Sequence, residues 1–152
     1  MPRLVVVLPL ATMAAGLRFA FRDWPLHLTV VPVFETAASV ADIAARLATV
    51  SASALTVTVG ADEGFGRSGG ITATVIEPSP DLMALHRSLT AALGPLEFEN
   101  PEYTGDGYRG HVTVKPHGRV HLGDALTLSQ LALVDMTPGN QREVLAVADL
   151  GP

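Results

Sequence analysis

The stretch LHLTVVP, residues 26–32, returns as GHVTVKP at residues 110–116, so that the pattern His-x-Thr-Val-x-Pro occurs twice in one chain. Both copies are rich in β-branched residues, which favour strands. Because successive side chains of a strand point to opposite faces, the histidine and the threonine of each copy share one face, and the apolar residues between them face the core. The repeat therefore predicts two strands that each present an imidazole and a hydroxyl on one side.

Four residues of the repeat are the candidate catalytic set: His27, Thr29, His111 and Thr113. Imidazoles titrate near neutral pH, so they can accept and donate protons. Two such strands brought together would surround a small anion. A single His-x-Thr has little specificity, but a pair that also matches at Val and Pro and uses two of only five histidines indicates function rather than strand composition.

The second copy also carries positive charge. Arg109 and Lys115 have the same strand parity as His111 and Thr113, so a regular strand would place all four on one face. Cations of this kind bind phosphate, and their charge favours the neutral, basic form of His111.

Composition limits the classes of protein that fit. The 152 residues, 48% of them hydrophobic, are enough for one domain, which we expect to span 1–152. No cysteine is present, which excludes a thiolate nucleophile and agrees with a cytoplasmic protein. The net charge of −5 argues against binding long duplex nucleic acid. The apolar start, Leu4–Leu10, is interpreted as a buried strand rather than a signal peptide, and no stretch is long enough to span a membrane.

Periodicity and turn residues predict two helices among several strands. One helix begins after Ser39 and runs to about Val50, and the other begins at Pro80, is capped by Ser79 and ends before Gly94. Strands are predicted over residues 3–8, 26–33, 55–59, 71–76, 108–115, 125–135 and 143–150. Residues 60–70 are predicted to form a hairpin loop; they lack the Gly-Lys-Ser/Thr ending of a phosphate-binding loop.

With these motifs and this order of elements, the chain resembles the 2H phosphoesterases, a superfamily named for paired His-x-Thr/Ser motifs, and within it the 2′-5′ RNA ligase-like and cyclic phosphodiesterase branch. The resemblance covers most of the chain. It also rests on three further segments: Gly64-Phe65-Gly66, Leu82-x-x-Leu85-His86-x-x-Leu89 and Tyr108-Arg109. One departure is Gly110, which stands where a proline commonly precedes the second histidine.

The resemblance implies an α+β, bilobal fold, with two antiparallel sheets facing a central cleft, helices on the outside and two pseudo-symmetric lobes. It implies a metal-independent phosphodiesterase without a cofactor, acting on a 2′,3′-cyclic phosphate or a 2′-5′ linkage in a nucleotide, an RNA end or a signalling oligonucleotide. The histidines would exchange protons with the attacking and leaving oxygens, and the threonines would stabilise the phosphoryl charge. Which histidine is the acid stays open, as does the alternative of a non-catalytic nucleotide- or phosphate-binding module.

Five residues are the candidates for substrate binding: Phe65, Arg67, Tyr108, Arg109 and Lys115. The aromatic ones would stack on a base, and the cations would meet phosphate. A small nucleotide or short RNA is the expected partner, and the sequence does not define the oligomeric state.

The other histidines, His86, His117 and His121, are expected to be structural or solvent-facing. A zinc site built from His111, His117 and His121 is the weaker alternative, because no nearby carboxylate completes a recognisable ligand pattern.

Overall fold

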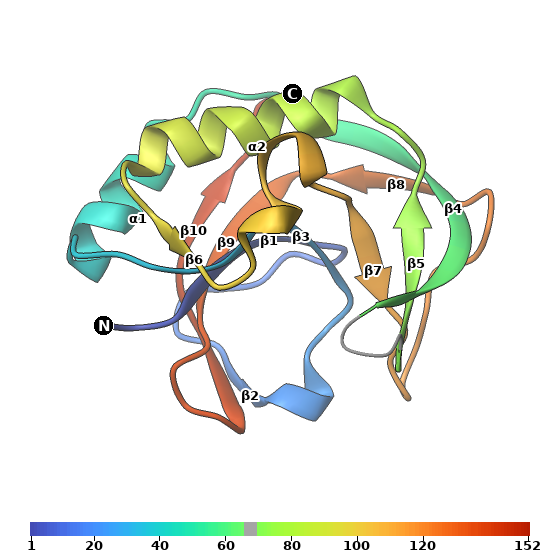
Figure 1. Cartoon of the computed structure of the whole chain (residues 1–152), viewed down its shortest axis with the longest axis horizontal. Coiled ribbons are helices and arrows are strands. Elements are labelled where there is room, and N and C mark those ends of the chain that lie inside the picture. Colours follow the sequence, from blue (N-terminus) through green and yellow to red (C-terminus); the bar gives the residue numbers. More distant parts are fainter. Residues whose placement is uncertain (66–69) are drawn as a thin grey trace.

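The chain folds into a strongly curved antiparallel sheet with two helices on its outer side (Figure 1). The computed structural model describes residues 1–65 and 70–152. Nine strands follow one another in the order β2-β10-β9-β1-β3-β7-β5-β4-β8, and β6 pairs with β3 beside this path. The strands are β1 (Leu4–Pro9), β2 (Arg18–Ala20), β3 (His27–Glu35), β4 (Leu55–Phe65), β5 (Ile71–Ile76), β6 (Glu97–Phe98), β7 (His111–Thr113), β8 (Ala125–Leu128), β9 (Gln130–Asp135) and β10 (Gln141–Asp149).

Both helices begin at the serine caps that the sequence indicates. Helix α1 is Val40–Ala48, and the Ser39 hydroxyl accepts a hydrogen bond from the Asp42 amide at 3.1 Å. Helix α2 is Pro80–Leu93 and ends at Gly94, whose φ of 84° suits glycine. No helix in the described part of the chain is both long and apolar enough to cross a membrane. Within the described residues, short 3-10 helices lie in the connections: η1 (Phe21–Asp23), η3 (Pro101–Tyr103) and η4 (Gly105–Gly107).

The two predicted motif strands, β3 and β7, are neighbours at the middle of the sheet. They pair antiparallel, with Leu28 opposite Val112. This pairing joins the half that contains β1, β9 and β10 to the half that contains β4, β5 and β8, so the two halves form one continuous curved sheet. The α+β class with antiparallel strands and external helices is confirmed.

Apolar side chains fill both faces of the first half. The larger cluster lies on the outer face and includes Leu28, Val112 and the stripe of leucines of α2. A second, smaller cluster contains Val5, Val7, Met13 and Trp24. These valines alternate along β1 with members of the larger cluster, so the segment that carries Met13 and Trp24 covers the inner face next to the motif strands.

Three predicted boundaries were wrong. Strand β4 continues to Phe65, which pairs with Ile71, so the predicted loop over residues 60–70 is in part a β-ladder. Strand β7 contains only His111–Thr113, whereas residues 108–115 were predicted. The strand predicted over residues 125–135 is two strands, β8 and β9, because Ser129 interrupts it. The short strands β2 and β6 were not predicted.

Gly110, the residue immediately before β7, lies close to helix α2. A Cβ atom at this position would lie 2.7 Å from Leu82 Cδ2 of α2. Its carbonyl also accepts a hydrogen bond from the Ile76 amide at 2.9 Å. Close contact with α2 thus leaves little room for a side chain immediately before the second histidine.

Candidate active site

The register of β3 and β7 brings the two motifs together. With Leu28 opposite Val112, the antiparallel ladder sets His27 opposite Thr113 and Thr29 opposite His111. Leu28 and Val112 are buried on the outer face, so the four motif side chains belong to the inner face. The geometry has an approximate two-fold symmetry through the central pair.

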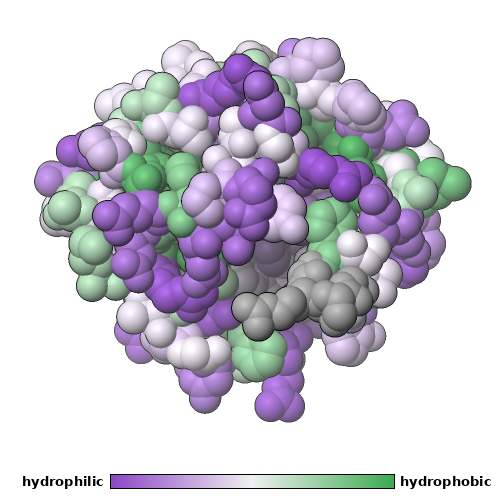
Figure 2. Space-filling view, viewed as in Figure 1, coloured by the Kyte–Doolittle hydropathy of each residue, from purple (hydrophilic) through white to green (hydrophobic). Residues whose placement is uncertain are grey.

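A cavity of about 370 Å³ opens on this inner face. It is lined by Val5, Trp24, His27, Thr29, Pro32, Val33, Phe65, Ile71, Asn100, Tyr103, Tyr108, Arg109, His111 and Met136. Three of the four predicted catalytic residues line it, whereas Thr113 and Lys115 are not among the lining residues. The space-filling view shows the molecule hollowed near the centre of the face drawn, with hydrophilic side chains over much of the surrounding surface (Figure 2).

Both histidines are held in the same way. Nδ1 of His27 lies 2.9 Å from the Pro25 carbonyl oxygen, and Nδ1 of His111 lies 3.1 Å from the Arg109 carbonyl oxygen. A carbonyl only accepts, so each Nδ1 carries the proton and donates it to the residue two positions earlier. In the neutral ring Nε2 is then the unprotonated nitrogen, available as an acceptor.

An aromatic ring supports each imidazole. His27 stacks on Trp24, with ring centroids 4.2 Å apart, and His111 stacks on Phe65 at 4.3 Å. Trp24 precedes His27 by three residues, whereas Phe65 comes from the end of β4. The hydrogen bond and the stack together fix the orientation of each ring before substrate binds.

The two imidazoles differ in acidity. Burial lowers the pKa of His27 to about 4, the Pro25 bond opposes this, and the charges of Lys115 and His111 add to the lowering. Burial also lowers the pKa of His111, with a further contribution from the Arg109 charge. Both rings are therefore neutral at neutral pH in the free protein.

A buried polar network supports the first motif from behind. The Tyr108 hydroxyl donates to the Thr29 carbonyl at 2.7 Å, and the Tyr108 ring stacks on His86 at 4.2 Å. His86 is fully buried; its Nδ1 donates to the Val30 carbonyl at 2.7 Å, and its Nε2 accepts from the Gly105 amide at 3.0 Å. Tyr108 is 7% exposed, so this geometry favours support of the Thr29 backbone over stacking on a base.

The predicted cations have different surroundings. Arg109 forms a two-pronged ion pair with Glu63 and lies over Phe65, 5.7 Å from the ring centroid. Lys115 reaches across to the first motif, with Nζ 5.9 Å from the Trp24 ring centroid. Arg67 lies outside the described residues. Trp24 and Glu63 were not predicted from the sequence, although an aromatic residue three positions before His27 was a usable signal.

His117 and His121 have hydrogen-bond partners outside the motifs. His117 Nε2 donates to the Trp24 carbonyl at 3.2 Å, and the His121 amide donates to Asp124 at 2.9 Å. Among the residues that the structure describes, no group of three or more His, Cys, Asp or Glu side chains could hold a metal ion. The zinc alternative therefore has no geometric support.

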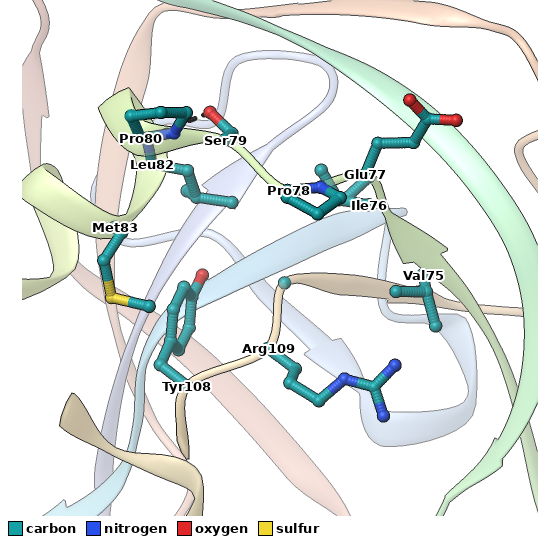
Figure 3. A pocket seen from close by; sticks show the side chains of 11 residues that line it. Val75, Ile76, Glu77, Pro78, Ser79, Pro80, Leu82, Met83, Tyr108 and Arg109 are labelled. Carbon is teal, nitrogen blue, oxygen red and sulfur yellow. Dashed lines mark hydrogen bonds between the residues drawn. The ribbon is translucent and has the colours of Figure 1, made fainter. Parts of the chain in front are cut away.

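A second cavity, of about 420 Å³, lies on the other side of Tyr108 and Arg109. Figure 3 shows these two residues on one side of it, and Pro78, Ser79 and Pro80, which lead into α2, on the other. Although it is the larger of the two, it contains neither motif histidine, so it is not the candidate active site.

The curved α+β sheet with paired His-x-Thr strands at its centre is the 2H phosphoesterase fold. Solved structures of Escherichia coli LigT share it: the complex with 3′-AMP has 14% identity, covers 99% of each chain and has a TM-score of 0.63. The complex with NADP+ has 14% identity, covers 99% of this chain and 98% of the other, and has a TM-score of 0.62. TT0787 of Thermus thermophilus has 18% identity over 97% of both chains, with a TM-score of 0.58.

The family model of the 2′-5′ RNA ligase superfamily matches residues 10–125, which includes both motifs. The chain belongs to this superfamily, and membership supports phosphoesterase chemistry in general. No curated protein sequence matches the chain.

Proposed function

We propose that the protein is a metal-independent phosphodiesterase that hydrolyses a 2′,3′-cyclic phosphate or a 2′-5′ phosphodiester of a nucleotide or short oligonucleotide. One observation carries the proposal. Both motif histidines donate Nδ1–H to a backbone carbonyl, which leaves two acceptor nitrogens, one from each strand, at a single cavity together with a threonine of the first motif. Opening a cyclic phosphate needs one proton acceptor and one proton donor of this kind.

His27 is the general base and His111 the general acid in the proposed reaction. Neutral His27 takes a proton from water as the water oxygen bonds to phosphorus. Protonated His111 gives its proton to the ribose oxygen as the phosphorus bond to that oxygen breaks. The two rings exchange protonation states, and a proton exchange with solvent restores them. The assignment follows from the deeper lowering of the His27 pKa, which keeps that ring unprotonated.

The threonines act on the phosphoryl oxygens. Hydroxyl donation from Thr29 and Thr113 stabilises negative charge that increases in the transition state. The strand pairing places each threonine opposite the histidine of the other motif. A phosphoryl group on the inner face of this strand pair would then receive one hydroxyl from each strand.

The cavity suits a mononucleotide unit. Its volume of about 370 Å³ falls in the range of small-molecule sites, and Tyr103, 43% exposed, offers a ring for stacking on a base. Of the similar solved structures, LigT has been crystallised with 3′-AMP, ATP and NADP+. These complexes support a nucleotide substrate for the present chain.

The test is turnover in EDTA of a panel of 2′,3′-cyclic mononucleotides and 2′-5′-linked oligoadenylates, with products identified by mass. His27→Ala and His111→Ala should each lose about 10³-fold or more in turnover number, because each removes a proton-transfer group. His121→Ala, at an exposed histidine, is the matched control and should retain activity. Full activity in either motif variant would remove that histidine from the mechanism.

The second candidate is a module that binds a nucleotide without converting it. It predicts that 3′-AMP binds while the unmodified protein turns over no member of the panel. The neutral state of both histidines at neutral pH is the feature that favours it, since the acid must be protonated to act. Turnover that appears as the pH is lowered toward 6 would decide for the enzyme.

A further inference from the structure

We propose that the His27 end of the cleft contains a second anion subsite, formed by Lys115, Arg142 and Trp24, which binds a further phosphoryl group of the substrate. The inference rests on the proposed function and narrows its substrate class. Ligands that carry one phosphoryl group beyond the reacting one would be preferred over simple nucleoside cyclic phosphates.

Two cations lie next to Trp24, the side chain that stacks on the proposed base, His27. Trp24 stacks on His27 at 4.2 Å between ring centroids. Lys115 Nζ lies 5.9 Å from the Trp24 ring centroid, and Arg142 Cζ lies 5.3 Å from it. Lys115 comes from the second motif and Arg142 from β10, so the fold brings them together from distant segments.

Neither cation has a carboxylate partner among the described residues. The arginines elsewhere on the sheet do: Arg109 pairs with Glu63, and Arg119 pairs with Asp62. The chain contains 15 acidic residues against 10 basic ones, so the lack of an acid beside these two is not a shortage of acids. Asp135 acts on Arg142 through its charge, but its Oδ1 accepts hydrogen bonds from the amide and hydroxyl of Thr137.

Donors at this place also lack acceptors. Arg142 is 8% exposed, and its Nη1 donates to the carbonyls of Pro138 and Gln141. Its Nε is buried without an acceptor in the described part of the chain, and the same holds for the indole Nε1 of Trp24. Buried donors without acceptors are costly and rare, so a ligand acceptor that came within reach of either nitrogen on binding would stabilise the complex.

The two positive charges raise each other's energy. Burial lowers the pKa of Lys115, and the nearby Arg142 charge lowers it further. Burial likewise lowers the pKa of Arg142; the Arg3 charge lowers it further, and the Asp135 charge opposes this. An anion between them would remove the repulsion and replace the water lost on burial, so ligand binding would relieve an unfavourable interaction of the folded protein.

A phosphoryl group fits this chemistry, because charge-assisted hydrogen bonds from ammonium and guanidinium groups are the usual phosphate contacts. The group could be the 5′-phosphate of a mononucleotide or the next phosphodiester of an oligonucleotide. Both offer anionic oxygens one ribose away from the reacting phosphate, so the experiment must include both.

The test compares calorimetric affinities for 3′-AMP, adenosine 3′,5′-bisphosphate and a diadenylate that ends in a 3′-phosphate. In the unmodified protein the bisphosphate or the diadenylate should bind about 10-fold or more tightly than 3′-AMP. Lys115→Met should reduce this ratio toward 1, and so should Arg142→Met. Arg87→Gln, which removes an equal charge from α2, should leave the ratio unchanged.

The possible affinity patterns distinguish the kind of phosphoryl group that the subsite binds. If only the bisphosphate gains affinity, the subsite takes a 5′-phosphate; if only the diadenylate gains, it takes a phosphodiester. Equal affinity for all three ligands overturns the subsite and leaves the proposed function standing, as does a ratio that survives Lys115→Met. If none of the ligands binds and neither the 2′,3′-cyclic nucleotides nor the 2′-5′ oligoadenylates are hydrolysed, the proposed function fails, and the inference fails with it.

Discussion

The surroundings of the two motif histidines differ more than the motifs themselves. Each imidazole is oriented by a carbonyl two residues earlier and by one stacked ring. Around His27, however, the ring is the buried Trp24, and the nearby cations have no carboxylate partner among the described residues. Around His111, the nearby cation, Arg109, is paired with Glu63. Symmetry of the backbone is thus combined with asymmetry of charge.

This difference in surroundings explains how one repeated motif can supply both a general acid and a general base. Identical residues in identical surroundings would have the same pKa, and neither would be favoured as the donor. Burial and the unpaired Lys115 charge keep His27 unprotonated, whereas neutralisation of Arg109 limits the repulsion felt by protonated His111. Either the surroundings or the motifs decide the roles of the two histidines, and variants of each distinguish the two explanations.

After the motif histidines, the largest effect is expected at the threonines. Thr29→Val and Thr113→Val keep the side-chain shape and remove one hydroxyl each, so each should lower the turnover number by about 10²-fold, as loss of one donor to a developing oxyanion does. Steady-state kinetics on a 2′,3′-cyclic nucleotide would measure this. Thr127→Val, at an exposed position on β8, is the control. Strongly unequal losses would show that the charge asymmetry extends to the phosphoryl contacts.

The buried His86 tests the support behind the first motif. His86→Ala should lower the free energy of unfolding by about 3 kcal/mol at pH 7.5, because it leaves the Val30 carbonyl and Gly105 amide without partners and opens a cavity. Burial lowers the pKa of His86, so the unfolded chain takes up a proton below about pH 6.5 that the folded chain refuses. Its stabilisation is therefore present above that pH and is lost on acidification.

Urea unfolding at pH 7.5 and 5.0 checks both statements. The deficit of the alanine variant should be smaller at pH 5.0 than at pH 7.5. His121→Ala, whose side chain is 73% exposed, should change the unfolding free energy by no more than about 0.5 kcal/mol. A deficit that grows at pH 5.0 would mean that His86 is charged in the folded protein.

The features of the fold and site that could be predicted from the sequence are those set by residues close together in the chain. The serine caps, the leucine stripe of α2 and the parity of His27 with Thr29 are set by neighbours in the chain, and they were found. The pairing of Leu28 with Val112 and the stack of Phe65 on His111 join segments that are far apart, which periodicity does not encode. The roles of the catalytic and binding candidates stay predictions, since only their placement is described.

A variant of Tyr108, which lies just before the second motif, tests whether this segment supports the first motif. Tyr108→Phe keeps the ring that stacks on His86 and removes the hydroxyl that donates to the Thr29 carbonyl. The expected cost is about 1 kcal/mol of stability. Because the Thr29 backbone is then held less firmly, we expect a several-fold lower turnover number with little change in KM. Tyr103→Phe, at an exposed ring, is the control; an equal kinetic change there would remove the support role from Tyr108.

The smallest effect is expected for the ion pair beside the proposed acid, and it addresses the comparison most directly. If His27 is the base and His111 the acid, kcat/KM should depend on pH as a bell, because the active form has neutral His27 and protonated His111. The acidic limb should lie near pH 4, where His27 gains its proton, and the alkaline limb below 6.5, where His111 loses its proton.

Glu63→Gln leaves the Arg109 charge without its partner, so the pKa of His111 should fall further. The alkaline limb should move to lower pH by a few tenths of a unit, about what one exposed charge contributes at this distance, and the acidic limb should stay in place. Asp62→Asn, which frees Arg119 instead, is the matched control and should leave the alkaline limb in place. If Glu63→Gln moved the acidic limb instead, His111 would be the base and His27 the acid. The cations beside His27 would then have a function other than keeping a general base unprotonated.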